Sequence, residues 1–209
     1  MDPILLRAET ERRFAAWHLM PNEHLPLLES LPALRPKSPV EVAARAVSAC
    51  YVAAFCFGTP APKVSESLKQ FGLWQHLTTA EQELLIDPSP DSQSLAFHGW
   101  LIESIQFLAW SLGLVALDHF TECSDQLATH FPRGGSDPAD FIAQAKLRPI
   151  NELLQEADTL YMLHWRAVEN KMIDRPDARV ALPRVSFRRQ AADWVIGVAE
   201  AWEEVPLDT

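Results

Sequence analysis

The stretch SPVEVAARAVSACYVAAFCF, from Ser38 to Phe57, sets the fold class of this 209-residue chain. Pro39 follows Ser38, and Glu41 comes three residues after the serine. This order predicts an N-terminal helix cap, because the serine hydroxyl and the glutamate carboxylate can each bond a backbone N–H group at the other position. The apolar residues behind the cap recur at helical spacing. A strong helix ending near Phe57 is therefore expected.

Similar signals along the chain predict an all-α protein. Glycine is scarce, with 7 residues, and strict apolar–polar alternation is nearly absent, which disfavours a β-sandwich. A second capping box begins at Thr78, and the 16 prolines separate the segments. We expect one domain, residues 1–209, forming a compact bundle of about seven to nine helices, with a helix and proline-rich lead-in over 1–37 before a core over 38–209. The clearest helices are expected over 3–18, 38–57, 64–71, 78–86, 92–114, 149–172 and 183–202, with a polar loop over 174–177.

Negative charge is concentrated in the middle of the sequence. Residues 64–145 hold eleven acidic side chains against Lys69 and Arg133, so this stretch carries −9 of the net charge of −10. Such a field repels nucleic acid and anionic membrane and attracts basic proteins or cations. The residues expected to form an acidic binding surface are Glu81, Glu83, Asp87, Asp91, Asp118, Glu122 and Asp125.

The location signals favour a cytoplasmic protein. The start, MDPILLRAETERR, lacks the apolar core of a secretory signal. Residues 95–117 resemble a membrane span in length, but Glu103 near the middle would cost about 2.5–3.5 kcal/mol on insertion, so a buried core helix explains them better. Cys50, Cys56 and Cys123 match no zinc or C-x-x-C spacing, which predicts buried, reduced thiols.

Two charged side chains fall on apolar helix faces. Glu103 lies in an aromatic stripe with Phe107 and Trp110, and Arg188 lies in the middle of the apolar stripe of the last helix. A buried charge without a partner is very costly. We therefore predict that Glu103 and Arg188 each pair with another group, either with each other or with separate partners.

A further polar cluster comes from the helix over 149–172, which carries Asp158, Tyr161 and His164. A buried carboxylate near a histidine suits general acid–base chemistry, so Glu103, Asp158 and His164 are the candidate catalytic residues if the protein is an enzyme. The same three residues and Arg188 also suit a buried hydrogen-bond network that fixes helix register, and this structural interpretation is favoured.

Other chemistries lack their motifs. No His-x-x-x-His or Glu-x-x-His pair occurs, and Asp118, Glu122 and Asp125 would form a solvated acidic face rather than a metal site if a helix continued that far. Gly134-Gly135 is not followed by the Gly-Lys-Ser/Thr of a phosphate loop, and no Gly-x-Ser-x-Gly sequence is found. We expect no metal and no cofactor.

Six short motifs, spread over residues 35–209, resemble an uncharacterised bacterial family, domain of unknown function 4272. The resemblance implies a helical cytoplasmic protein and transfers no activity. The chain departs from the family pattern at Glu203, where an Asp is usual. The motifs are Pro39-Val-Glu-Val-Ala-Ala-Arg45, Leu77-Thr-Thr-Ala-Glu81, Trp100-x-x-Glu103 through Trp110-x-x-Gly113, Glu156-Ala-Asp158 through His164-Trp165, Arg188-Arg189 with Trp194, and the ending Trp202-Glu-Glu-Val-Pro-Leu-Asp-Thr209.

These observations support three hypotheses. The first is a non-catalytic acidic protein that docks a basic protein, most concretely a cytoplasmic immunity protein that neutralises a bacterial toxin such as a nuclease. The second is a hydrolase of a small polar substrate that uses Glu103, Asp158 and His164 in a pocket between helices. The third is a small-molecule sensor with an aromatic pocket made by Trp100, Trp110, Trp165 and Trp194. The partner's identity and the oligomeric state stay open.

Overall fold

The computed structural model describes residues 2–29, 33–172 and 177–207, and all regular secondary structure in these ranges is helical. The all-α prediction is therefore confirmed. Contacts between residues divide the chain into unit 1, residues 1–37, 118–122 and 148–209, and unit 2, residues 38–117 and 123–147. The expected single domain stays a prediction. Most of the loop expected over 174–177, and the last two residues of the Trp202 motif, lie outside the described residues.

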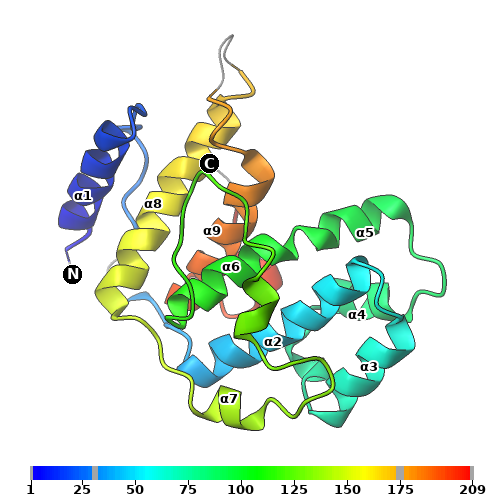
Figure 1. Cartoon of the computed structure of the whole chain (residues 1–209). Coiled ribbons are helices and arrows are strands. Elements are labelled where there is room, and N and C mark those ends of the chain that lie inside the picture. Colours follow the sequence, from blue (N-terminus) through cyan, green and yellow to red (C-terminus); the bar gives the residue numbers. More distant parts are fainter. Residues whose placement is uncertain (1, 30–32, 173–176, 208–209) are drawn as a thin grey trace. The chain divides into compact units, whose positions relative to one another are not determined.

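Unit 1 is built around α8 (Ile150–Glu169), which packs against α1 (Pro3–Ala16) on one side and α9 (Leu182–Ile196) on another (Figure 1). The Asp2 side chain caps α1 by accepting from the Ile4 N–H at 2.9 Å, and Pro3 occupies the first helical position. A short 3-10 helix, Trp202–Glu204, follows α9. Unit 1 therefore joins the first helix of the chain to the last two.

The end of α9 differs from the sequence prediction, which extended this helix to residue 202. Gly197 ends it with φ of +82°, the left-handed conformation typical of a glycine C-cap. The Gly197 carbonyl accepts a hydrogen bond from the Arg35 N–H at 3.3 Å. A Cβ on Gly197 would lie 2.0 Å from the Arg35 carbonyl oxygen, so only glycine fits here.

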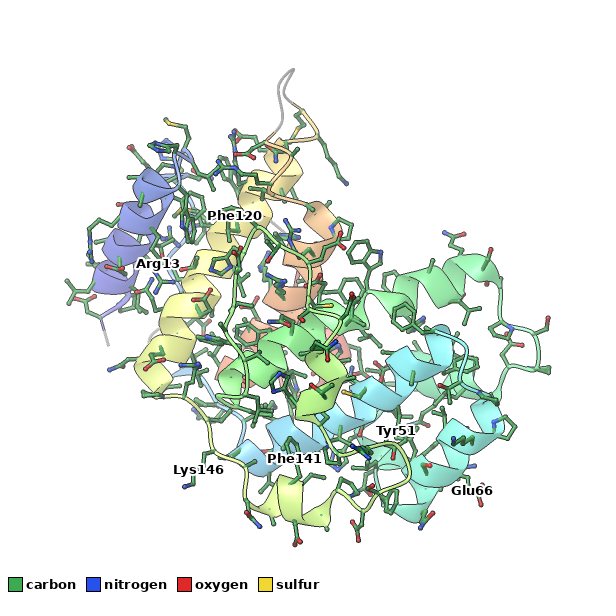
Figure 2. The ribbon with its side chains drawn as sticks, viewed as in Figure 1. Arg13, Tyr51, Glu66, Phe120, Phe141 and Lys146 are labelled. Atoms are coloured by element: carbon green, nitrogen blue, oxygen red, sulfur yellow. The ribbon has the colours of Figure 1, made fainter. Side chains whose placement is uncertain are left out.

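Unit 2 is arranged around α2 (Pro39–Cys56). Its other helices are α3 (Ala61–Gln70), α4 (Thr79–Ile86), α5 (Ser92–Gly99), α6 (Leu101–Ser111) and α7 (Ala139–Ala143), and all five contact α2 (Figure 1). Figure 2 shows Phe141 on the side of α7 that faces α2. Short 3-10 helices span Trp74–His76 and Leu127–His130.

Both predicted capping boxes are present in unit 2. Ser38 caps α2 with Glu41, and Thr78 caps α4 with Glu81. The single long helix predicted over 92–114 is wrong, because a turn at Trp100 separates α5 from α6. Gly99 directly precedes this turn, and glycine in a helix interior costs about 1 kcal/mol relative to alanine.

Among the described residues, α2 is the one helix whose length and composition would suit a membrane span. Its apolar window is 56% buried inside the structure, as expected of a core helix. Val42, Ala46 and Val52 are among its buried residues. Residues 95–117, the stretch that resembles a span in the sequence, are interrupted at Trp100 and leave helical geometry after Ser111.

Candidate functional site

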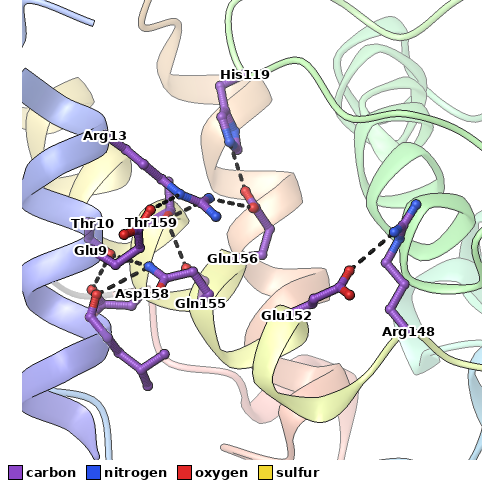
Figure 3. Close-up of polar contacts among 11 residues, drawn as sticks. Glu9, Thr10, Arg13, His119, Arg148, Glu152, Gln155, Glu156, Asp158 and Thr159 are labelled. Carbon is purple, nitrogen blue, oxygen red and sulfur yellow. Dashed lines mark hydrogen bonds and ion pairs between the residues drawn. The ribbon is translucent and has the colours of Figure 1, made fainter. Parts of the chain in front are cut away.

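Asp158 is the centre of a closed polar cluster between α8 and α1. Arg7 donates from Nη2 to Asp158 Oδ1 at 2.8 Å and from Nε to Oδ2 at 3.2 Å, and Thr10 donates to Oδ2 at 2.5 Å. Gln155 donates in turn to the Thr10 hydroxyl at 2.9 Å (Figure 3). Asp158 is 1% exposed. Its carboxylate therefore bonds α1 to α8 and is too buried to contact a substrate.

A second cluster on α8 involves Glu156, which Figure 3 shows between Arg13 and His119. Arg13 Nη1 donates to Glu156 Oε2 at 3.0 Å, and His119 Nε2 lies 2.8 Å from Oε1. Burial raises the pKa of the Glu156 carboxyl, but His119 and Arg13 outweigh this effect, so its pKa lies below the usual range. The ring of His119 also packs edge-on against Trp17, with centroids 5.1 Å apart.

His164 belongs to a third cluster, between α8 and α9. Arg189 Nη1 lies 2.9 Å from His164 Nδ1, and Arg189 Nε donates to Asp193 Oδ2 at 3.1 Å. The Arg189 guanidinium stacks on the Tyr161 ring at 4.5 Å. Burial, then Arg189, lowers the pKa of His164 to about 4. The imidazole is therefore neutral at pH 7, with Nδ1 accepting from Arg189.

Asp193 differs from the other buried acids because one of its oxygens is unpaired. The residue is 3% exposed, and Oδ1 has no hydrogen-bond partner in the described part of the chain. Burial raises the pKa of this carboxyl to about 7, although Arg189 acts in the opposite direction. Asp193 and Arg189 line a cavity of about 470 Å³ in unit 1, together with Tyr161 and with apolar residues from 25–28, Leu34 and the 196–206 segment.

The predicted three-residue enzyme site is not assembled within either unit. Glu103 belongs to unit 2, and Asp158 and His164 belong to unit 1. Within unit 1, Asp158 binds residues of α1 whereas His164 binds α9, so the two side chains occupy different faces of α8. Sequence analysis selected them because it could place residues along α8 but could not assign the helix that covers each face.

Glu103 and Arg188 are both buried, and each bonds the backbone. Glu103 is 0% exposed and accepts from the Cys123 N–H at 3.2 Å. Arg188 donates to the carbonyls of Asp118 at 2.5 Å and Thr121 at 2.9 Å. Because the two side chains belong to different units, their pairing with each other stays a prediction.

Glu81, expected at an acidic binding surface, is buried in unit 2. Arg45 donates to its two carboxylate oxygens at 2.8 and 2.7 Å, and both side chains are 3% exposed. Burial raises the pKa of Glu81, but Arg45 and the Thr78 cap outweigh it and hold the pKa below its usual range. Glu81 therefore serves the interior of unit 2 rather than its surface.

The other six acids of the expected surface are exposed, and they are divided between the two units. Residues 112–126 are irregular, so Asp118, Glu122 and Asp125 share no helix. Asp118 instead closes a turn by accepting from the Phe120 N–H at 2.7 Å. Asp118 and Glu122 lie in unit 1, and each unit carries a net charge of −5 when the acids and bases are counted by unit. The charge imbalance of the sequence is therefore shared equally by the folded units.

Glu83, Asp87 and Asp91 remain together in unit 2, near a groove of about 670 Å³ contributed by α2 to α5 and the loops between them. Asp87, Ile86 and Leu95 line this groove. Ile86, a large apolar side chain that lines the groove, is 68% exposed, whereas Phe57 (68%) and Phe97 (60%) are exposed at the end of α2 and in α5 and do not line it. This region, the α2–α5 groove, combines acidic and apolar exposed side chains.

The cysteines and possible metal ligands add no reactive centre. Cys50, Cys56 and Cys123 are unbridged and half-buried, which is more exposed than expected. Burial raises the pKa of Cys50 to about 12 and that of Cys56 to about 11, so these two thiols are protonated at neutral pH. No cluster of three or more His, Cys, Asp or Glu able to hold a metal ion occurs in the described ranges.

Sequence analysis missed most partners in these clusters. Arg189 and Asp193 are four residues apart on a buried helix face, and this spacing was a usable signal. Arg45 likewise falls in the apolar stretch that follows the Ser38 cap. No comparable signal linked Arg7 to Asp158, because their contact spans 151 residues.

The fold and the site define an all-α protein whose buried acids are held mainly by arginines and by the backbone. The chain belongs to the family described as Domain of unknown function (DUF4272), whose model matches residues 6–205. This match confirms the resemblance and extends it to residue 6, so that it includes most of α1. No curated protein and no solved structure matches the chain.

Proposed function

We propose that this protein is a non-catalytic binding protein that docks a basic protein partner at the α2–α5 groove. Its most concrete form is a cytoplasmic immunity protein that neutralises a bacterial toxin such as a nuclease. The observation that carries the proposal is the exposure of Ile86 and Asp87, which both line this groove, with the exposed acids Glu83 and Asp91 close to them in the chain. Exposed large apolar residues within a polar rim are typical of protein interaction sites.

The chemistry of the groove favours a basic occupant. Glu83, Asp87 and Asp91 are exposed along α4 and the loop that leads to α5. Lys63 is the exposed base nearest in sequence to the groove-lining residues of α3, so acids outnumber bases here. Lys and Arg side chains of a partner would pair with these acids, and such charge pairs mainly accelerate association.

The buried acids support a binding role over catalysis. Asp158 is bonded by Arg7 and Thr10, and Glu81 is bonded by Arg45. Residues that perform acid–base chemistry must reach a substrate, whereas these buried carboxylates accept hydrogen bonds from side chains of the protein itself. The hydrolase hypothesis loses its Asp158 for this reason.

The test is a charge-reversal capture experiment with a matched control. Glu83→Lys, Asp87→Lys and Asp91→Asn are combined; asparagine keeps the cap that Asp91 gives the Ser94 N–H at 2.8 Å. The control combines Glu23→Lys, Asp140→Lys and Glu203→Gln, which makes the same charge change at exposed residues that do not line the groove. The tagged wild type and both variants are used to capture partners from the native lysate at low and high salt.

We expect the wild type and the control to recover one basic protein, and the groove variant to lose it. Affinity for the purified partner should fall at least tenfold in the groove variant and should fall with salt. An Ile86→Asp variant should also lose the partner, because it removes apolar contact without adding positive charge. Retention of the partner by the groove variant would refute the proposed surface.

A further inference from the structure

We infer that the unit 1 cavity lined by residues of α8 and α9, by residues 25–29 and by Leu34 binds a small organic ammonium ion that has an apolar body. This site is separate from the α2–α5 groove and does not depend on the function proposed for it. Its volume, about 470 Å³, falls within the range of ligand pockets in proteins. The inference rests on the polar groups of the cavity and on the composition of its wall.

Asp193 is the residue that points to a ligand. Its Oδ2 accepts from Arg189 Nε, whereas its Oδ1 has no hydrogen-bond partner among the described residues, although the side chain is buried and lines the cavity. A buried acceptor left unpaired costs about 1–3 kcal/mol. A ligand N–H group that donates to Oδ1 would remove this cost.

The charges around the cavity favour a cationic ligand over an anionic one. Arg189 is the positively charged lining residue, and it is bonded to His164, Asp193 and the Pro206 carbonyl. Asp193 and the exposed Glu29 also line the cavity, which gives two carboxyl groups to one guanidinium. Burial raises the pKa of Asp193 to about 7, and a bound ammonium ion would favour its ionised form.

The rest of the wall selects an apolar ligand body. Its side chains are mostly aliphatic, and Val198 is 39% exposed at the cavity. Burial of an apolar ligand body against such a wall is favourable by about 25 cal/mol per Å² of apolar area. The aliphatic lining includes Leu25, Leu27, Leu34, Ile196 and Val198.

Three probes with one apolar body test the inference by titration calorimetry at pH 7.5. They are 4-phenylbutylamine, 4-phenylbutanol and 4-phenylbutyrate, which end in an ammonium, a hydroxyl and a carboxylate group. We expect single-site binding of the amine, at least about tenfold weaker binding of the alcohol and none of the carboxylate. Equal binding of the three probes, or no binding of the amine, would overturn the inference.

Two variants locate the bound probe. Asp193→Asn should weaken amine binding at least about tenfold and leave alcohol binding unchanged, because the ion pair is lost while the apolar wall is kept. Val198→Trp should fill the cavity and abolish amine binding without touching the polar cluster. Ile4→Trp, at an exposed position of α1, is the matched control and should bind the amine like the wild type. Wild-type affinity in Val198→Trp would place the probe elsewhere and refute the site.

Discussion

Arg7 and Asp158, 151 residues apart in the chain, form a two-point ion pair inside unit 1. The same guanidinium donates to the carbonyls of Leu25 at 2.7 Å and Pro26 at 2.9 Å. One side chain thus fixes α1, α8 and the segment that follows α1. The pair explains why a charged residue of α1 and an acid of α8 are both buried: each supplies the charge that the other needs.

Removal of one partner of this pair should therefore be costly. Asp158→Ala leaves Arg7 buried without its counter-charge, and we expect the free energy of unfolding to fall by about 3–5 kcal/mol. Urea unfolding followed by tryptophan fluorescence measures the change. Asp140→Ala removes an exposed acid in the first turn of α7, and its free energy of unfolding should stay within about 0.5 kcal/mol of the wild type. A loss below about 1 kcal/mol for Asp158→Ala would contradict the structural role.

Two glycines with similar backbone angles should respond differently to alanine. Gly197 has φ of +82° and Gly113 has φ of +75°. A Cβ at Gly197 meets the backbone of Arg35, whereas nothing lies within 4 Å of one at Gly113. Gly113→Ala should cost about 1 kcal/mol from the strained backbone alone. Gly197→Ala should lower the free energy of unfolding clearly more than Gly113→Ala in the same urea titration. Equal losses of stability in the two variants would show that the contact with Arg35 is unimportant.

Asp193 gives unit 1 an unusual dependence on pH. Its pKa in the folded protein is about 7, above the usual carboxyl value, so the folded state binds the proton more tightly than the unfolded state. The stability contributed by this group is therefore greatest below about pH 4 and is lost as pH rises to about 7. We expect the difference in unfolding free energy between the wild type and Asp193→Asn to fall by about 2–4 kcal/mol over this interval.

The comparison with Asp193→Asn is needed because His164 titrates in the same pH interval and its effect on stability has the opposite pH dependence. Its pKa is lowered to about 4, so its contribution increases with pH up to the ordinary histidine pKa. Arg189 faces both groups, and Tyr161 and Glu29 line the cavity with Asp193. If the unfolding free energy of the wild type, relative to that of Asp193→Asn, increased with pH, Asp193 would behave as an ordinary salt-bridged carboxylate.

Glu81 should show the opposite pH response to Asp193. Its pKa is lowered by Arg45, so the stability that it provides is present above the ordinary carboxyl pKa and is lost as pH falls through the folded value. Glu81→Gln should cost about 1–3 kcal/mol at pH 7, because the buried Arg45 loses its charge partner. In urea titrations, the difference in the free energy of unfolding between the wild type and Glu81→Gln should decrease below pH 4. A difference that does not change with pH would contradict an ionised Glu81.

Local sequence signals predicted helix boundaries well where a capping residue or a proline marks the start of the helix. The Ser38 and Thr78 boxes begin α2 and α4 as expected. The predictions failed at Trp100 and at Gly197. A Cβ at Gly99 would contact the Phe57 ring at 3.9 Å, and the Arg35 backbone lies against Gly197. Helical periodicity alone contains no information on such contacts.

The candidate site shows the same limit more strongly. The burial of Glu103 and Arg188 followed from their positions in apolar stripes, since helix period alone fixes which face a residue occupies. The partners of Asp158 and His164 did not follow, because helix period does not determine which helix covers a face. The acidic centre of the sequence was also divided by the fold, which assigns Asp118 and Glu122 to one unit and Asp125 to the other.

The division of unit 1 into distant segments has a consequence for synthesis on the ribosome. Arg7 is made 151 residues before Asp158. At typical bacterial to eukaryotic elongation speeds the delay is roughly 8 to 30 seconds, far longer than a helix needs to form. During this time α1 has no counter-charge for Arg7, while every residue of unit 2, which ends at residue 147, is made. All segments of unit 2 are therefore made before α8, whereas the Arg7 side chain of α1 gains its ion-pair partner only when α8 is made.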